Sequence, residues 1–136
     1  MTQPSEKLFL GAQMAAQFFG PEILEDIQKQ ARDDLPSKVG AEYFAEVCFS
    51  GYARPGLKFR DRCLINIGML IALNRSPELR LHVRAALHNG LSKEEIVEAC
   101  RHAMVYTGVP AGREALTVVS DVFKEADKTK GQAKLA

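Results

Sequence analysis

The sequence of 136 residues predicts an all-α protein of about six helices in a single domain. Apolar residues recur at three- and four-residue spacings along most of the chain, as they do on one face of a helix. No segment alternates apolar and polar residues as a half-buried strand does. Capping residues and glycine–proline pairs divide the periodic segments, and a chain of this length can bury one core of moderate size.

The first part of the chain predicts three helices that form a packing layer. Residues 6–19 form the first helix, and Gly20 with Pro21 ends it before a short second helix. Ser37 is expected to cap the third helix, which stops near Gly51. The expected apolar face of this third helix consists of Val39, Tyr43, Phe44 and Val47.

The next helix, residues 60–74, follows a turn at Arg54-Pro55-Gly56 and is apolar nearly all round. A helix without a polar face must be covered on all sides. In so small a domain, a second subunit is expected to cover part of it, so the sequence predicts a homo-oligomer.

Residues 76–90 carry helix signals at both ends. Ser76 is a suitable N-cap, Pro77 suits the first helical position, and Gly90 is a suitable stop. Between them, Glu78 and His82 stand four residues apart on one face of the helix.

The last two helices are predicted from capping signals. Ser92 and Glu95 form a capping box for a helix that ends at Gly108. Pro110 then starts the final helix. The polar tail, residues 127–136, is expected to be frayed.

Composition excludes several classes of protein. The 18 basic and 17 acidic residues give a net charge of +1 and are interspersed, which argues against a nucleic-acid partner. The three cysteines are odd in number and widely separated, which fits neither a disulfide framework nor a metal or dithiol site. No secretory signal is visible, and the longest apolar tract, residues 63–73, is too short to cross a bilayer. We therefore expect a cytoplasmic protein with no membrane partner.

Glu78 and His82 are the first candidate functional residues. A carboxylate beside an imidazole can orient the ring and raise its basicity, as general acid–base catalysis requires. The alternative is a weak electrostatic pair on an exposed helix, which the same spacing also produces.

Four further residues are candidates for binding an anionic substrate. A guanidinium makes directional paired hydrogen bonds to a carboxylate, so Arg54 and Arg62 are candidate anchors, and a tight structural loop is the alternative. His102 and Tyr106, four residues apart on one helix, are the other candidates. For His102 the alternative is a histidine packed in the core.

The run from Arg54 to Leu116 carries a family pattern: R-P-G-L at its start, E-L-R-L-H ending at His82, and Y-T-G-V-P from Tyr106. With these motifs the chain resembles the carboxymuconolactone decarboxylase family of the alkylhydroperoxidase-like superfamily. The peroxidase branch of that superfamily uses a C-x-x-C pair, but here Arg75 and Glu78 stand at the two cysteine positions. The chain therefore is similar to the decarboxylase branch.

This resemblance implies an alkylhydroperoxidase-like helical domain that assembles as a homo-oligomer, a hexameric ring or a trimer. It implies a cofactor-independent decarboxylase of a small carboxylated lactone, similar to 4-carboxymuconolactone, in the protocatechuate and β-ketoadipate pathway of aromatic catabolism. His82 would be the proton donor, Glu78 its orienting partner, and Arg54 or Arg62 the carboxylate anchors. No metal or organic cofactor is needed, because the lactone carbonyl accepts the electrons.

Two other functions stay open from the sequence. One is a thiol-dependent peroxidase that uses Cys63 or Cys100, although both lie in apolar runs that favour inert thiols. The other is a non-catalytic helical oligomer that binds a carboxylated metabolite. The residues that depart from the family pattern, and so bear on the substrate, are Tyr52, His102, Thr107, Arg113 and Glu114.

Overall fold

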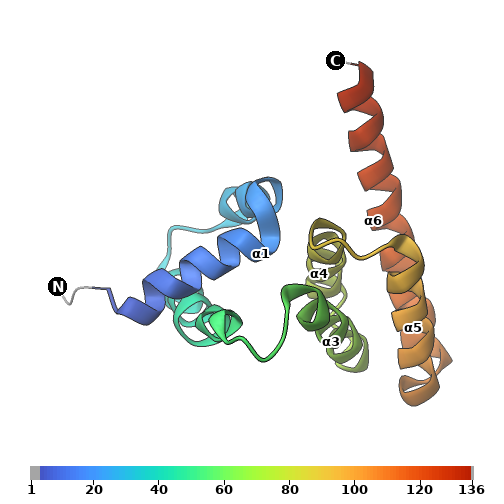
Figure 1. The fold of residues 1–136 in the computed structure, drawn as a ribbon, viewed down its shortest axis with the longest axis horizontal. Coiled ribbons are helices and arrows are strands. Elements are labelled where there is room, and N and C mark those ends of the chain that lie inside the picture. The colour runs from blue at the N-terminus through green and yellow to red at the C-terminus, as the bar shows by residue number, and fades with distance from the viewer. Residues whose placement is uncertain (1–3, 136) are drawn as a thin grey trace. The chain divides into compact units, whose positions relative to one another are not determined.

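The computed structural model describes residues 4–135, which form six α-helices and two short helical segments and contain no strand (Figure 1). The all-α class and the number of helices are therefore as predicted. The chain divides into two compact units, Met1–Phe59 and Arg60–Ala136, and each is described by itself.

The first unit begins with α1, Glu6–Gln30, whose start is capped by Ser5 through a hydrogen bond from the Leu8 N–H. At Gly20 the backbone leaves the helical region, with φ 78° and ψ 168°. Glycine adopts a positive φ without the strain that a side chain would cause. The predicted break at Gly20 and Pro21 is confirmed, as a sharp kink within one helical element.

After α1 come α2, Leu35–Tyr43, the π-helical η1, Phe44–Cys48, and the 3-10 segment η2, Phe49–Ala53. Asp34 caps α2, because its carboxylate accepts a hydrogen bond of 2.9 Å from the Ser37 N–H. The prediction that Ser37 is the cap is wrong, because the Ser37 amide is itself one of the groups that the cap satisfies.

Aromatic side chains fill the core of the first unit. Phe18 lies at its centre, with its ring centroid 5.0 Å from that of Tyr52 and 5.6 Å from that of Phe49. At Gly11, α1 approaches η1 so closely that a Cβ there would lie 1.6 Å from the Ala45 carbonyl oxygen. The predicted apolar face of the third helix joins this core in part, because the ring centroid of Phe44 lies 4.5 Å from that of Phe49. All four residues of that face are nevertheless exposed: Val39, Tyr43, Phe44 and Val47.

The second unit contains α3, Phe59–Ala72, and α4, Ser76–His88. The residue that precedes the first turn of α4 is Arg75, which makes no side-chain cap. The prediction of Ser76 as the N-cap is wrong, because its hydroxyl donates a 3.0 Å hydrogen bond to Glu114 instead. Gly90, with φ 87°, lies just after α4, so the predicted stop is confirmed.

Two longer helices complete this unit: α5, Lys93–Thr107, and α6, Val109–Leu135. The capping box of Ser92 and Glu95 is present with both hydrogen bonds, and Gly108, with φ 92°, ends α5 as predicted. Where the sequence predicts a frayed tail from Asp127, α6 stays helical through Leu135. Its last turns extend past α5 in Figure 1.

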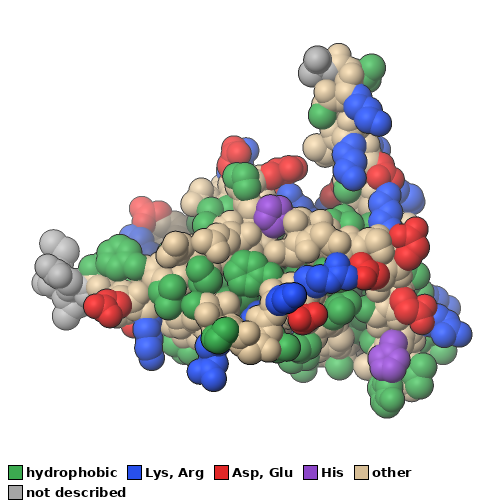
Figure 2. All heavy atoms as spheres, in the orientation of Figure 1, with side chains coloured by type: hydrophobic (Ala, Val, Ile, Leu, Met, Phe, Trp, Pro, Cys, Tyr) green, Lys and Arg blue, Asp and Glu red, His purple; other side chains and the backbone are tan. Residues whose placement is uncertain are grey.

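The core of the second unit joins α3, α4, α5 and α6. Its fully buried side chains are Cys63, Ile67, Val83, Ala85, Ala86, Ile96 and Cys100, with Val119 and Val122 almost as deep. Ion pairs fasten α6 to its neighbours, from Arg80 to Glu125 and from Lys93 to Asp127. Beyond Asp127, the charged side chains in the described part of α6 are all basic, and Figure 2 shows this projecting end in blue. No helix within residues 4–135 is long and apolar enough to cross a membrane.

Candidate active site

Helices α3 and α4 run antiparallel, and their contacts fix which residues face each other. Arg60 donates a hydrogen bond of 3.2 Å to the Gly90 carbonyl oxygen at one end of the pair. Further along, the Asn66 side-chain nitrogen Nδ2 lies 3.4 Å from Nδ1 of His82. As the residue number rises on α3, that of the facing residue on α4 falls. Asn66 and His82 therefore meet across this helix pair.

His82 is partly buried, and its surroundings keep it uncharged. Burial lowers its pKa to about 4, and the nearby Glu78 carboxylate acts in the opposite direction without compensating. Glu78 lies one turn earlier on α4 and is exposed. At neutral pH the imidazole therefore carries one proton, and its charged form is disfavoured. A role as proton donor requires that a bound anion first raise this pKa.

The arginines on α3 have different surroundings. Arg62 is partly buried and stands four residues before Asn66, so it lies on the same side of α3, roughly 6 Å along the axis. It is the predicted anchor that shares a helix face with the Asn66–His82 contact. Arg60 instead pairs with Glu95 and the Gly90 carbonyl, which joins α3 to the start of α5.

The other predicted site residues lie elsewhere. Arg54 is exposed in the first unit, where its backbone N–H donates a 3.1 Å hydrogen bond to the Gly51 carbonyl oxygen. His102 and Tyr106 are exposed on α5, with their ring centroids 5.4 Å apart. Within the described residues, the structure shows no hydrogen bond or ring contact between this pair and His82.

Asn66 is the residue of this site that sequence reasoning missed. The sequence predicts that Asn66, which interrupts an apolar helix, satisfies backbone groups and does not bind substrate. A polar residue within an apolar helix could have indicated this contact. A polar side chain on a helix that packs on several sides needs a hydrogen-bond partner. His82, 16 residues later, is that partner.

The two core thiols are in surroundings that oppose reactivity. Burial raises the pKa of Cys63 to about 12, although a hydrogen bond with Asn89 and the charge of Arg60 act against this. Burial also raises the pKa of Cys100 to about 11. The predicted burial and raised pKa of both thiols are confirmed, and both properties oppose formation of the nucleophilic thiolate at neutral pH.

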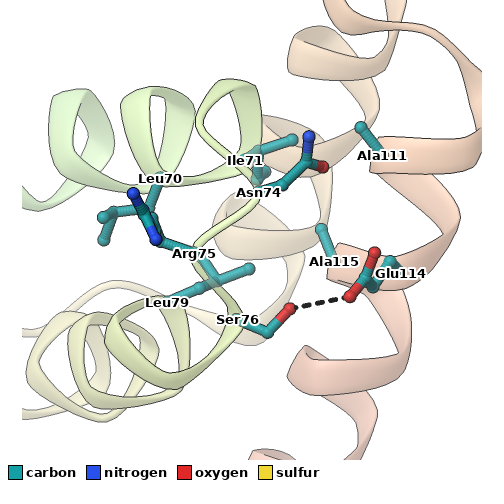
Figure 3. A pocket seen from close by; sticks show the side chains of 9 residues that line it. All are labelled: Leu70, Ile71, Asn74, Arg75, Ser76, Leu79, Ala111, Glu114 and Ala115. Carbon is teal, nitrogen blue, oxygen red and sulfur yellow. Dashed lines mark hydrogen bonds between the residues drawn. The ribbon is translucent and has the colours of Figure 1, made fainter.

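A small hollow lies between the end of α3 and the starts of α4 and α6 (Figure 3). Its polar edge includes the Ser76 to Glu114 hydrogen bond, which Figure 3 draws as a dashed line. The hollow includes neither Glu78 nor His82 among its lining residues. These are Leu70, Ile71, Asn74, Arg75, Ser76, Leu79, Ala111, Glu114 and Ala115. Within residues 4–135, no three His, Cys, Asp or Glu side chains gather as a metal site would.

Comparison with known proteins decides the family. The model of the carboxymuconolactone decarboxylase family matches residues 40–121, which is more than half of the chain. The chain belongs to the carboxymuconolactone decarboxylase family. All six candidate residues lie within the matched range: Arg54, Arg62, Glu78, His82, His102 and Tyr106.

Three similar proteins differ in the share of their length that this chain matches. The chain is 42% identical to 4-carboxymuconolactone decarboxylase of Acinetobacter baylyi over 54% of this chain, and it spans only 55% of that relative. It is 34% identical to nitrosuccinic acid decarboxylase of Metarhizium robertsii over 74% of this chain and 72% of the relative. It is 31% identical to an uncharacterized 15.0 kDa protein of Paracoccus denitrificans over 94% of this chain and 99% of the relative.

Two of these relatives are named as decarboxylases of small carboxylic acids. For a member of the carboxymuconolactone decarboxylase family, these names support a carboxy-lyase kind of reaction. The two names give different substrates, so they do not select one.

Proposed function

We propose that this protein is a cofactor-independent decarboxylase of a small carboxylated lactone such as 4-carboxymuconolactone, and that it acts in the protocatechuate and β-ketoadipate pathway. The observation that carries the proposal is the contact between Asn66 and His82, beside Glu78 and Arg62, in a chain of the carboxymuconolactone decarboxylase family. The A. baylyi relative, 42% identical over the matched part, supports the choice of substrate.

The chemistry of this reaction sets what the site must provide. The bond between a ring carbon and a carboxylate breaks, carbon dioxide leaves, and the electron pair moves through the conjugated system to the lactone carbonyl oxygen. A proton then adds to carbon. The site must hold the second carboxylate, stabilise the negative oxygen and exclude competing reactions. The lactone carbonyl serves as the electron acceptor within the substrate.

The residues of the second unit meet these needs in part. The Arg62 guanidinium suits the carboxylate that stays on the substrate, since it offers paired N–H donors. The His82 imidazole would face the reacting end, and Glu78 would orient it. His102 and Tyr106, on α5, are further proposed contacts to the substrate, as is Arg54 of the first unit.

Turnover of 4-carboxymuconolactone, followed by ultraviolet absorbance, tests this function directly. The parent protein should consume the lactone and release carbon dioxide in equal amounts. The His82→Gln variant should fold and lose most of the turnover, because glutamine cannot replace the imidazole. A His88→Gln variant is the matched control, because it makes the same change at an exposed position of the same helix, where no role is proposed. Full turnover by His82→Gln would remove His82 from the mechanism.

A carboxylate-binding oligomer without catalysis is the alternative that the same residues allow. It predicts tight binding of the lactone with no release of carbon dioxide. Calorimetric titration beside the absorbance assay separates the two functions. The peroxidase alternative is less favoured, because the pKa values of both core thiols are raised.

The proposed enzyme is a cytoplasmic homo-oligomer, a hexamer or a trimer. Support for assembly comes from α3, where the apolar side chains of Ile65, Met69 and Leu73 are 46%, 51% and 65% exposed. They follow one another at four-residue intervals and so form one stripe along the helix. A second copy of the chain would cover this stripe.

A further inference from the structure

The contact between Asn66 and His82 indicates which ring nitrogen of His82 is protonated. The Asn66 atom in contact is the amide nitrogen, 3.4 Å from Nδ1 of His82, which is at the long end for a hydrogen bond. An amide nitrogen donates and does not accept, so Nδ1 is the acceptor in this contact. A neutral imidazole has one acceptor nitrogen and one N–H, so the proton lies on Nε2.

The surroundings of His82 also oppose a second proton. An imidazolium donates from both nitrogens, so a proton on Nδ1 would set two donors against each other. Burial lowers the pKa of His82 in the same direction. Among the described residues, the charge that acts on this pKa is Glu78, on α4 itself. On α3, the group in contact with the ring is the neutral amide of Asn66, and Arg62 stands one turn earlier on the same helix.

We infer that Asn66 is a positioning residue, which holds His82 as the neutral tautomer with its proton on Nε2. In one respect this inference rests on the proposed function, because it states what His82 presents to the lactone. As the carbon–carbon bond breaks, the Nε2–H group donates a hydrogen bond to the carbonyl oxygen on which negative charge develops. His82 keeps its proton in this step. Water gives the proton to carbon and becomes hydroxide.

This role differs from the proton donor that the family resemblance implies for His82. A neutral imidazole is a good hydrogen-bond donor, and a donor that is held in place before the reaction stabilises an oxyanion. No change of protonation is needed between the free protein and the transition state. The residue that decides between the two roles is Asn66, because it fixes which ring nitrogen carries the proton.

Nitrogen-15 NMR of the full chain, labelled at histidine, tests the tautomer without any substrate. The His82→Gln variant identifies the His82 signals. In the parent protein at pH 7, Nε2 should show the shift of a protonated ring nitrogen and Nδ1 that of an unprotonated acceptor. Asn66→Asp places a carboxylate against Nδ1, so the proton should move to Nδ1 and the pKa of His82 should rise.

Kinetics on the same variants tests what the tautomer does. Asn66→Asp should lower kcat by roughly 10²- to 10³-fold, as the loss of one oxyanion donor does, with little change in KM and a shifted pH profile. Asn66→Leu, which has no donor, should show mixed tautomers and a smaller loss, and it keeps the test valid if the aspartate variant folds poorly. Gln132→Glu makes the same amide-to-carboxylate change on an exposed part of α6 and should alter none of these quantities.

The outcomes separate this inference from the proposed function. A proton on Nδ1 in the parent protein, or an unchanged tautomer in both Asn66 variants, overturns the positioning role even if the lactone is consumed. The expected tautomers with no turnover of the lactone by the parent protein support the positioning role and overturn the proposed function instead.

Discussion

Glu78 and His82 stand one turn apart on α4, yet the carboxylate is exposed and the imidazole is partly buried with a pKa lowered to about 4. Burial therefore outweighs the opposite charge four residues away. The pair is neither a simple surface contact nor an imidazole made basic by its carboxylate. The two side chains lie in different surroundings, so the effect of substituting each can be measured separately.

The first prediction concerns Glu78. Glu78→Gln removes the charge that raises the pKa of His82, so this pKa should fall further, below about 4. If Glu78 orients the imidazole, kcat should fall about tenfold, which corresponds to about 1.4 kcal/mol of transition-state stabilisation. NMR titration and lactone turnover measure the two effects. Glu98→Gln, a change at an exposed position on α5, is the control. A raised pKa of His82 in Glu78→Gln would contradict this account.

Stability should depend on pH through His82. Its pKa is 6.5 when unperturbed and about 4 in the folded protein. Between these values the unfolded chain binds a proton that the folded protein does not, so acid favours unfolding. The free energy of unfolding should fall by up to about 3 kcal/mol from this group as the pH drops from above 6.5 to 4. Urea denaturation of the parent and His82→Gln should show a flatter pH dependence in the variant, and equal slopes would refute the prediction.

Thiol reactivity should differ between the exposed and the buried cysteines. Cys48 is exposed, whereas Cys63 and Cys100 are buried with raised pKa values. A chromogenic disulfide reagent should therefore modify one thiol per chain quickly, and Cys48→Ser should abolish that fast phase. Hydroperoxide reduction with added thiol should be absent in both proteins. Fast modification of Cys63 or Cys100 in the native state would restore the peroxidase alternative.

Local signals in the sequence predicted several features correctly. One is the capping box, whose two residues, Ser92 and Glu95, lie within one turn of each other. The others are the helix stops at Gly90 and Gly108, where each glycine has a positive φ. Neighbouring residues decide such features, so a short stretch of sequence contains the information. The kink at Gly20 is of the same kind.

Contacts between distant residues were not predictable in the same way. Ser76 has the right residue type for a cap, but Glu114, 38 residues later, takes its hydroxyl. The partner of Asn66 is likewise on another helix. Residue spacing on one helix does not indicate which side chains of the next helix it contacts. The contact of His82 with the Asn66 amide, and the lowered pKa of His82, could therefore be found only from the structure. The family pattern located His82 and Glu78 but did not indicate Asn66.

Gly11 provides a test of the packing in the first unit. A Cβ at this position would lie 1.6 Å from the Ala45 carbonyl oxygen, which is backbone and cannot rotate away. Gly11→Ala should therefore destabilise by at least 1–3 kcal/mol, seen as a fall in Tm of about 5 °C or more. Gly40→Ala is the matched control on α2, where a Cβ meets nothing within 4 Å. That change should be neutral or stabilising by up to about 1 kcal/mol. Equal Tm values for the two variants would contradict the close approach of α1 to η1.

Met69 lies at the middle of the exposed stripe on α3, between Ile65 and Leu73. If a second copy of the chain covers this stripe, Met69→Glu buries an unpaired charge in the interface and should reduce the assembly to smaller species. Light scattering after size-exclusion chromatography measures the mass. Leu135→Glu makes the same apolar-to-acidic change at a residue that is 90% exposed at the end of α6, and it should leave the mass unchanged. A Met69→Glu protein with the parent's mass would show that the subunits meet through a different surface.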